Sequence, residues 1–468
     1  MALVAGVDSS TSACKVQVYD ADTGELVSSG RAPHPLTTPP RSEQDPAAWW
    51  TAFEIAWAAA GADAPHRPAA VSIAGQQHGL VVLDAAGKVL RPAKLWNDTE
   101  SAPDAAALVD ALGAEAWARA CGSVPVASFT ITKLRWLRRA EPEVFARVAQ
   151  VLLPHDWLTR RLTGDSTTDR GDASGTGWWS PQDEQYRYDL LGLVDDAKPW
   201  DQMLPDVLAP TASAGSWNGL LLGPGTGDNM AAALGLGLRT GDVVLSLGTS
   251  GVASCVSDRP AADPTGTVAG FADATGRYLP LVCTLNATKV TDAIARLLGV
   301  DARGLSDLAL GSVPGAGGLV LVPHLDGERT PNRPDATGTL AGIRSDVTRE
   351  HLARAAIEGV VANLLAGAGE LARWEPSIAD GRILLVGGGA RSAAFRQVVA
   401  NLTGRPVLVP AADELVARGA AIQAAAVLAG CSIDEVAAAW GTGPVLTVEP
   451  DPAADGAATR AAYAAVVR

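Results

Sequence analysis

The sequence predicts an α/β protein built from two related domains, and three observations carry this prediction. Short apolar runs alternate with longer segments of helical character, which indicates a partly parallel sheet flanked by helices. A strand-and-turn pattern near the N-terminus recurs half a chain length later. The chain has 468 residues, 47% of them hydrophobic, and at about 150 residues per domain this length allows roughly three domains. The half-length repeat favours two.

The first third of the chain supplies the clearest elements. Residues 3–7 form an apolar run typical of a buried strand, and a polar turn follows at 8–12. Two further strands are expected at 14–19 and 25–29, joined by an Asp- and Gly-rich turn. A helix at 45–61 and strands at 70–74 and 80–84 complete the alternation.

The repeat places a second strand and hydroxyl turn at 242–250, with the pattern of residues 4–12. Thr11-Ser12 and Thr249-Ser250 are therefore 238 positions apart. Such a period indicates duplicated domains, although Thr-Ser pairs in turns are common enough to coincide by chance. A glycine-punctuated break at 235–241 favours a boundary near 238, and hence domains at 1–238 and 239–468.

Charge and cysteine content exclude several classes of function. Thirty-seven Lys and Arg against 51 Asp and Glu leave a net charge of -14, which repels nucleic acid and anionic membranes. The five cysteines are scattered without a C-x-x-C pair, so neither a disulfide framework nor a zinc site is expected. No signal peptide or membrane span is expected. These features predict a cytoplasmic enzyme or binding protein, and they leave its oligomeric state open, a homodimer included.

A carboxylate and a run of hydroxyls follow the first expected strand. Asp8 ends that strand, and the turn contains Thr11 and Ser12, with Lys15 shortly after. Oxygen ligands beside a nest of backbone N–H groups suit hydrated Mg²⁺ and phosphate. An Asx turn that only shapes the hairpin would use Asp8 in the same place.

The glycine-rich segment 223–227 leads to a second carboxylate, Asp228. Residues 230–235 are expected to be helical, which would put Asp228 at a helix N-terminus, where the dipole lowers its pKa and keeps it ionised. An ionised carboxylate can accept a proton from a substrate hydroxyl. The alternative is an ordinary Asp N-cap.

Two more turns carry polar or glycine-rich sequences. Gly387-Gly-Gly-Ala-Arg-Ser392 follows an apolar strand at 383–386 and precedes a helix at 393–402. That order lets a nucleotide approach the backbone, although plain strand–helix packing also uses such turns. Gly75-Gln-Gln-His78-Gly79 ends the strand at 70–74. Its amides and imidazole would suit a polyol, whereas a lone His after a strand is more often structural.

Two longer motifs resemble the signatures of a known protein family. Residues 128–137, Ser-Phe-Thr-Ile-Thr-Lys-Leu-Arg-Trp-Leu, resemble its first signature, with Lys133 and Trp136 in place. Residues 338–343 and 351–358 fit its second signature throughout. In motif order from about residue 3 to 429, the chain resembles the FGGY carbohydrate kinases of the actin/hexokinase-like ATPase superfamily. Further polar motifs resemble the members that act on D-xylulose; they lie at 42–46, 73–79, 95–98, 153–156 and 327–331.

This resemblance implies two actin/hexokinase-like (ribonuclease H-like) α/β domains with the active site in the interdomain cleft. It implies a sugar-binding domain at 1–238, an ATP-binding domain at 239–468, and ATP-dependent phosphorylation of a ketopentose, D-xylulose at its 5-hydroxyl. Asp228 would be the general base. The other implied contacts are Gln77, His78, Asp228 and Asn229 for the sugar, Asp8 and Asp228 for Mg²⁺, Thr11, Ser12, Lys15, Gly248, Thr249 and Ser250 for the phosphates, and Gly388, Gly389 and Ala390 for adenosine.

The chain departs from the family pattern at three positions. Ser10 stands where Gly is usual, Gln77 where Met is common, and Ala140 where a polar residue is usual. Three alternatives therefore stay open: an FGGY kinase for ribulose, glycerol or a related polyol, a nucleotide-binding scaffold of the actin or chaperone type, and an inactive kinase homologue.

Overall fold

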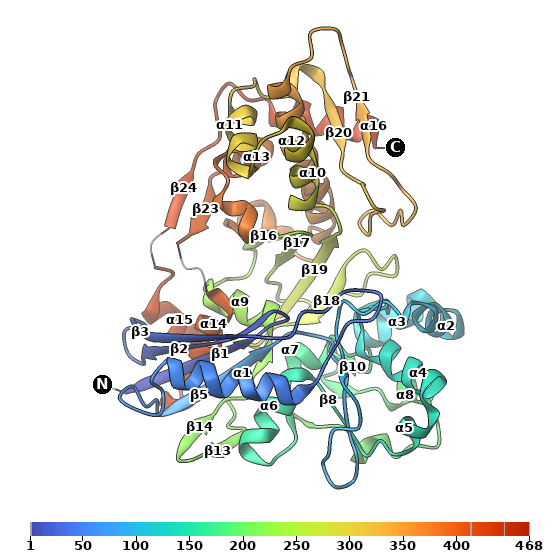
Figure 1. Cartoon of the computed structure of the whole chain (residues 1–468), viewed down its shortest axis with the longest axis vertical. Helices are drawn as coiled ribbons and strands as arrows, with labels where there is room; N and C mark the ends of the chain where they lie inside the picture. The colour runs from blue at the N-terminus through green and yellow to red at the C-terminus, as the bar shows by residue number, and fades with distance from the viewer. Residues whose placement is uncertain (1, 412–413, 444, 468) are drawn as a thin grey trace. The chain divides into compact units, whose positions relative to one another are not determined.

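The computed structural model describes residues 2–411, 414–443 and 445–467, which form two compact units (Figure 1). Unit 1 comprises Met1–Leu238, Pro260–Leu279 and Ala412–Thr442, and unit 2 comprises Arg239–Arg259, Pro280–Ala411 and Gly443–Arg468. Each unit consists of three separate stretches of the chain, and residues 1–238 belong to unit 1.

Unit 1 is built on a mixed seven-stranded sheet in the order β13-β14-β5-β1-β2-β3, with β15 also paired to β5. Strands β1, β2 and β3 form an antiparallel meander, whereas β5 and β14 run parallel to β1 and to each other. The predicted strands in this region are confirmed. The strands are β1 (Leu3–Ser9), β2 (Ala13–Asp20), β3 (Leu26–Pro33), β5 (Ala70–Gly75), β13 (Gly215–Trp217), β14 (Leu220–Leu222) and β15 (Thr226–Gly227).

Helices pack on the sheet of unit 1. The predicted helix at 45–61 is α1 (Pro46–Ala59), which Asp45 caps by accepting from Ala47 N–H, and it packs on β2 and β3. The apolar core between them also includes residues from α6 (Pro154–Thr163). Phe53 and Trp57 of α1 pack against each other with ring centroids 5.4 Å apart and planes tilted by 37°. Burying aromatic rings of this size contributes on the order of 2 kcal/mol each.

The returning segment 412–442 belongs to unit 1 because α14 (Leu415–Ala429) packs on β1, β5 and α9 (Asp228–Gly235). At Gly6 an added Cβ would lie 2.5 Å from Ala421 N and still nearer Ala417 O, so only glycine lets the helix backbone approach the strand this closely. The sequence pattern did not show that contact, since it joins residues about four hundred positions apart.

The remaining elements of unit 1 are short. The helices are α2 (Ala102–Leu112), α3 (Ala114–Cys121), α4 (Thr130–Ala140), α5 (Pro142–Ala146), α7 (Arg170–Ala173), α8 (Tyr188–Gly192) and α15 (Ile433–Trp440). The strands are β4 (Glu43–Gln44), β6 (Val81–Leu83), β7 (Ala93–Lys94), β8 (Gln150–Leu152), β9 (Thr167–Asp169), β10 (Trp179–Ser180), β11 (Gln185–Tyr186), β12 (Asp206–Leu208) and β18 (Ala269–Ala272).

Unit 2 contains a second sheet in which β19-β17-β16-β22-β23-β24 are neighbours. Its strands are β16 (Val243–Leu247), β17 (Gly251–Cys255), β19 (Tyr278–Thr284), β22 (Ile383–Val386), β23 (Val407–Pro410) and β24 (Val445–Val448), with a separate pair β20 (Val320–Val322) and β21 (Thr339–Ala341). Its helices are α10 (Thr288–Leu298), α11 (Ala302–Leu310), α12 (Arg349–Leu371), α13 (Ala393–Thr403) and α16 (Gly456–Val466). The long apolar helix α12 is 78% buried over its most apolar window, as expected of a core helix.

The two sheets have the same topology. In each, three antiparallel strands (β3-β2-β1 and β19-β17-β16) are followed by two parallel ones (β5-β14 and β22-β23) and an antiparallel edge strand. The repeated strand-and-turn pattern of the sequence therefore falls on equivalent hairpins, β1–β2 and β16–β17. This agreement supports duplication over coincidence.

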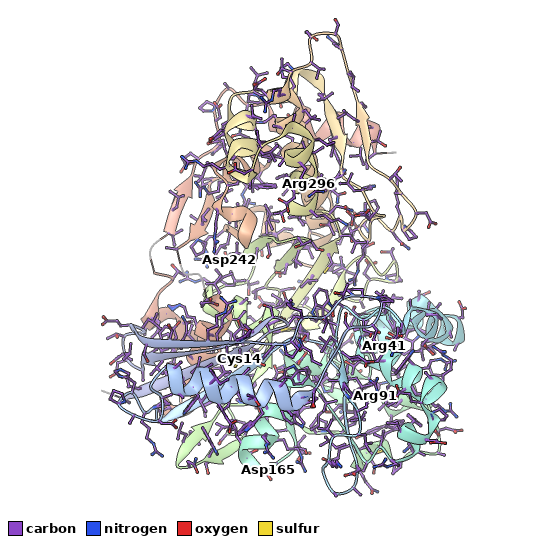
Figure 2. All side chains as sticks on the ribbon, in the orientation of Figure 1. Cys14, Arg41, Arg91, Asp165, Asp242 and Arg296 are labelled. Atoms are coloured by element: carbon purple, nitrogen blue, oxygen red, sulfur yellow. The ribbon has the colours of Figure 1, made fainter. Side chains whose placement is uncertain are left out.

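Three of the five cysteines, Cys14, Cys121 and Cys255, are buried. All five are free thiols, and Cys14 is fully buried on β2 (Figure 2). Burial, with a smaller effect from the charge of Asp8, raises the pKa of the Cys14 thiol far above its usual range. The thiol is therefore an unreactive part of the core.

Candidate active site

Three parallel strands of unit 1 end at the same edge of the sheet. Asp8 of β1 lies opposite Ala74 of β5, and Thr226 of β15 also lies opposite Ala74. Ligands of open α/β sheets bind at the carboxyl ends of strands. The predicted site residues of this unit that follow or end these strands are Asp8, Gln77, His78, Asp228 and Asn229.

Asp8 is a buried carboxylate held by a hydroxyl and a cation. Its side chain is 2% exposed. Lys15 Nζ donates to Asp8 Oδ2 over 3.1 Å and also pairs with Glu414 Oε2 at 2.6 Å. Partial desolvation lowers the pKa of Lys15, but these two carboxylates outweigh it and the pKa is raised. The Ser10 hydroxyl donates to Asp8 Oδ1, so the departure from Gly adds a partner to Asp8.

Asp228 is the first residue of α9, and its N-cap is Gly227. Desolvation and the negative charge of Asp8 raise the pKa of Asp228 to about 7, despite backbone N–H bonds from Asn229 and from Asp228 itself that act in the opposite direction. The expectation of a lowered pKa is therefore wrong. The dipole is present, but burial beside a second carboxylate has the larger effect.

A hydrogen bond joins two of the strand ends. Asn229 Nδ2 donates to Gln77 Oε1 over 2.7 Å and lies 3.3 Å from Asp228 Oδ1. Gln77 is buried, whereas Asn229 is exposed. The pair leaves an amide surface next to a carboxylate, which is a donor and acceptor set suited to several hydroxyl groups.

His78 is held in one orientation by backbone and rings. Its φ is 66°, in the left-handed region that non-glycine residues seldom adopt. The ring Nδ1 lies 2.8 Å from the carbonyl of Gly175, and Phe129 packs edge-on with centroids 5.1 Å apart. Because a carbonyl only accepts, Nδ1 carries the proton, and in the neutral ring Nε2 is then an acceptor.

The turn between β1 and β2 presents hydroxyls. Trp96 Nε1 donates to Thr11 Oγ1 over 2.8 Å, and the Thr11 carbonyl accepts from Gln44 Nε2. Ser12 is exposed. These contacts hold Thr11 in place next to Ser10, whose hydroxyl donates to Asp8.

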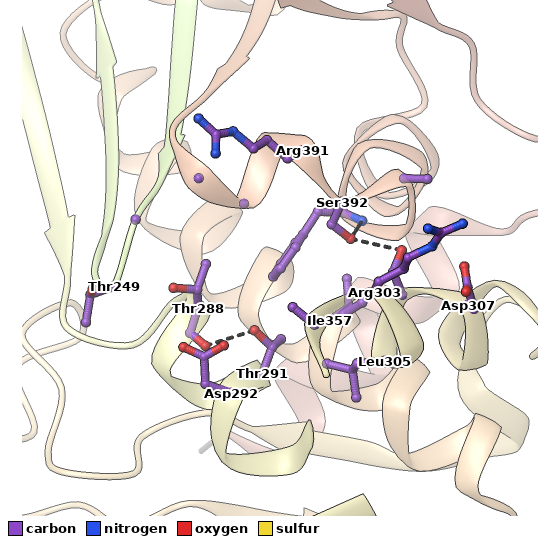
Figure 3. Close-up of a pocket in the computed structure, with 17 residues that line it drawn as sticks. Thr249, Thr288, Thr291, Asp292, Arg303, Leu305, Asp307, Ile357, Arg391 and Ser392 are labelled. Carbon is purple, nitrogen blue, oxygen red and sulfur yellow. Dashed lines mark hydrogen bonds between the residues drawn. The ribbon is translucent and has the colours of Figure 1, made fainter. Parts of the chain in front are cut away.

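Unit 2 contains a cavity of about 770 Å³ at the end of its own sheet (Figure 3). It lies between the β16–β17 turn, the glycine-rich turn after β22, and helices α10, α11, α12 and α13. Its lining residues include Gly248, Thr249, Thr288, Asp292, Arg303, Ser306, Gly388, Gly389 and Phe395. Small-molecule sites have volumes of about 300–1,000 Å³.

The glycine-rich turn of unit 2 packs directly on β16. Gly387 has a φ of 86°, and an added Cβ would lie 2.7 Å from the carbonyl oxygen of Leu247. Gly388 has open space where a Cβ would be. The turn therefore needs glycine at Gly387 for its backbone, while Gly388 exposes backbone to the cavity.

Two family models match the chain. The N-terminal domain of the FGGY family of carbohydrate kinases matches residues 3–235, and the C-terminal domain of that family matches residues 243–428. The chain belongs to the FGGY family of carbohydrate kinases. The predicted fold class is confirmed by these matches together with the sheets described above.

Individual FGGY proteins are similar to this chain over nearly their whole length. The xylulose kinase of Streptomyces coelicolor (strain ATCC BAA-471 / A3(2) / M145) is 51% identical over 466 residues, which cover 96% of this chain and 94% of that protein. The xylulose kinase of Streptomyces rubiginosus is 51% identical over 464 residues, 96% of this chain and 93% of that one. The crystal structure of xylulose kinase from Bifidobacterium adolescentis superposes with a TM-score of 0.87 at 43% identity, covering 100% and 99% of the two chains.

The predicted site residues of this FGGY kinase form two groups. Unit 1 holds Asp8, Thr11, Ser12, Lys15, Gln77, His78, Asp228 and Asn229, and unit 2 holds Gly248, Thr249, Ser250, Gly388, Gly389 and Ala390. Four of the unit 2 residues line the cavity. Ser250 lies on the exposed side of its turn and Ala390 is buried, and neither lines the cavity.

Several residues that line the cavity of unit 2 were not identified from the sequence. Asp292, Arg303 and Ser306 lie on α10 and α11, and Phe395 on α13. The Ser392 hydroxyl donates to Ser306 Oγ over 3.1 Å and so links two of these helices. Only the folded arrangement of the helices brings these scattered polar residues together, and no local motif marks them.

Proposed function

We propose that this FGGY kinase transfers the terminal phosphoryl group of ATP to the 5-hydroxyl of D-xylulose, with Asp228 as general base. The observation that carries the proposal is the group formed by Asp228, Asn229 and Gln77, where a carboxylate with a pKa near neutrality adjoins a hydrogen-bonded pair of amides. The similarity to xylulose kinases over 96% of the chain supports the choice of sugar.

The raised pKa of Asp228 supports the base role. A general base works best when its pKa is close to the pH of the reaction, and the pKa of this carboxyl is about 7. Asp228 would accept the proton of the 5-hydroxyl as its oxygen attacks phosphorus, and ADP would leave. A positioned base contributes about 10²–10⁴-fold to such a step.

Sugar recognition would use groups with defined roles. With Nδ1 donating to the carbonyl of Gly175, the His78 ring is held in one orientation, in which it would contact one sugar hydroxyl. Gln77 and Asn229 hold each other, and the remaining amide groups would meet other hydroxyls. Groups fixed in advance lose little freedom on binding, which favours both affinity and alignment.

The cavity of unit 2 is proposed to hold ATP. Its volume suits a nucleotide, the backbone of Gly388 is open to it, and the Asp292 carboxylate suits ribose hydroxyls. Transfer between substrates held by different units requires the two groups of residues to meet in the catalytic complex.

Mg²⁺ fits the carboxylates of unit 1. Asp8 and Asp228 are close enough for the charge of Asp8 to raise the pKa of Asp228, and a divalent cation would relieve that repulsion. Asp8 and Asp228 would hold the ion, which when bound supplies charge neutralisation at the phosphates.

A coupled ADP-release assay tests the proposal with D-xylulose, D-ribulose, glycerol and no sugar. We expect the highest kcat/KM with D-xylulose, and a 5-phosphate product by NMR. Asp228→Asn is expected to lose most turnover, whereas Asp110→Asn, an exposed aspartate on α2, keeps it. ATP turnover indifferent to every polyol would contradict kinase activity and favour a nucleotide-binding scaffold, and a preference for ribulose or glycerol would contradict the choice of sugar.

A further inference from the structure

A buried cluster of charged residues in unit 1 has no role in the chemistry described so far. His155 and Asp156 open α6, and Asp169 and Asp172 lie at the end of β9 and in α7. His155 Nε2 is 3.2 Å from Asp156 Oδ1, 3.5 Å from Asp169 Oδ1 and 3.4 Å from Asp172 Oδ2. His155, Asp156 and Asp172 are fully buried, and such a cluster is costly to maintain.

The cluster lies against the two strand ends that carry the sugar residues and the proposed base. An added Cβ on Gly75, the last residue of β5, would lie 3.0 Å from His155 Cβ. An added Cβ on Gly225, next to β15, would lie 2.6 Å from His155 Nδ1. His155 therefore lies close to the backbone just before Gln77 through its Cβ and main chain, and close to the backbone just before Asp228 through its imidazole ring.

One hydrogen bond connects the cluster to the segment of the base. The Thr226 hydroxyl donates to Asp169 Oδ2 over 2.7 Å. Asp169 also caps α7, accepting from the backbone N–H groups of Gly171 and Asp172. Thr226 is fully buried and precedes Asp228 by two residues, so this bond restrains the backbone from which Asp228 projects.

His155 offsets part of the repulsion among the buried carboxyl groups around it. Desolvation lowers the pKa of His155, but Asp156, Asp169 and Asp172 outweigh it and raise the pKa to about 9. The imidazolium is then the counter-ion of the carboxylates around it. Burial raises the pKa of Asp172 well above its usual range, with His155 acting in the opposite direction.

We propose that His155 and Asp169 are positioning residues of the kinase: acting through Thr226 and through the backbone at Gly75 and Gly225, they hold Asp228 in place relative to Gln77 and His78. Neither residue is proposed to touch a substrate. The inference rests on the proposed role of Asp228. It explains why an ionic cluster is kept in the interior at this point of the fold.

Thr226 offers the gentlest test, since replacing His155 risks misfolding. Thr226→Val removes the hydroxyl that donates to Asp169 and keeps the shape, and Thr226→Ser keeps the hydroxyl. Thr403→Val is the matched control, because the Thr403 hydroxyl donates over 2.7 Å to the carbonyl of Val399 in α13. We expect kcat of Thr226→Val to fall about 10- to 100-fold, with KM for ATP and Tm near wild-type values. Thr226→Ser should keep kcat within about 3-fold, and Thr403→Val should keep wild-type kcat.

A double-mutant cycle with Asp169→Asn identifies the route of the effect. If Asp169 acts through Thr226, the double variant is no slower than the slower single variant. A wild-type kcat in Thr226→Val, equal losses in the Val and Ser variants, additive losses in the cycle, or a kcat loss matched by a collapse in Tm would each overturn the proposal.

Crystal structures of the same variants separate this inference from the proposed function. Displacement of the Asp228 carboxylate in Thr226→Val by roughly 1 Å, the scale at which misplacement impairs catalysis, is visible without any substrate. An unmoved carboxylate would contradict the positioning role. Failure of wild-type protein to phosphorylate D-xylulose would refute the proposed function, and the carboxylate position would still decide the inference.

Discussion

Replacing Asp228 by Asn should make the metal-free protein more stable while it removes most activity. Asp228 is a partly buried carboxylate whose pKa burial and Asp8 raise to about 7. In the unfolded chain the pKa is about 3.9. An acid whose pKa rises on folding destabilises the fold when it is ionised: the cost is absent below about pH 4, grows as the pH rises, and is complete above about pH 7.

The magnitude follows from these two pKa values. Their difference corresponds to about 4 kcal/mol at 1.36 kcal/mol for each pH unit. Solvent contact at the partly exposed carboxylate reduces this, so we expect about 2 kcal/mol at pH 8. For a unit of this size, that raises Tm by roughly 5 °C. The gain should shrink as the pH falls from 8 to 5, because the folded wild-type carboxyl takes up a proton over this range before the unfolded one does.

Calorimetry in EDTA at pH 8 and pH 5 measures this effect, and Asp110→Asn serves as the control because its side chain is exposed. The control should shift Tm little at either pH. A gain in Asp228→Asn that is the same at both values, or a loss of stability at pH 8, would refute the electrostatic reasoning. In the same variant, turnover measured by ADP release should fall about 10²–10⁴-fold. Asp228→Asn should therefore be more stable and less active than the wild-type protein.

Three further outcomes follow from the geometry of the two units. Gly387→Ala should lower Tm by several degrees, because Gly387 has a left-handed backbone and an added Cβ would lie 2.7 Å from the Leu247 carbonyl oxygen. Gly388→Ala should leave Tm unchanged, because a Cβ on Gly388 would meet open space. Equal effects of the two substitutions would contradict the packing argument. His78→Asn keeps a residue type that tolerates the left-handed conformation, so the backbone should be kept. Loss of the imidazole contact should raise KM for D-xylulose roughly 10-fold and leave KM for ATP unchanged. A rise in both KM values would indicate general disruption. EDTA should abolish turnover and excess MgCl₂ restore it; full activity in EDTA would contradict a metal role for Asp8.

Much of the local structure could be predicted because it depends on local patterns. The apolar run at 383–386 and the strand β22 have the same bounds, and α1 lies within the helix expected at 45–61. Asp8 was found as a candidate because it ends an apolar run in a turn, and Asp228 because it follows a glycine-rich segment and precedes an expected helix. These features depend on residues a few positions apart, where side-chain type and backbone preference are directly linked.

The pKa of Asp228 could not be predicted, because it depends on the burial of this carboxyl and on its distance to Asp8, 220 positions earlier. The same holds for the residues that line the cavity of unit 2 and for the contact of His155 with Gly75 and Gly225. The sequence alone determined the family, those strands and helices that a local pattern marks, and the chemical type of each site residue. Tertiary structure alone decided which charges lie together and how far burial shifts their protonation, since electrostatic energy depends on separation in space and access to water, and neither is encoded in any short stretch of chain.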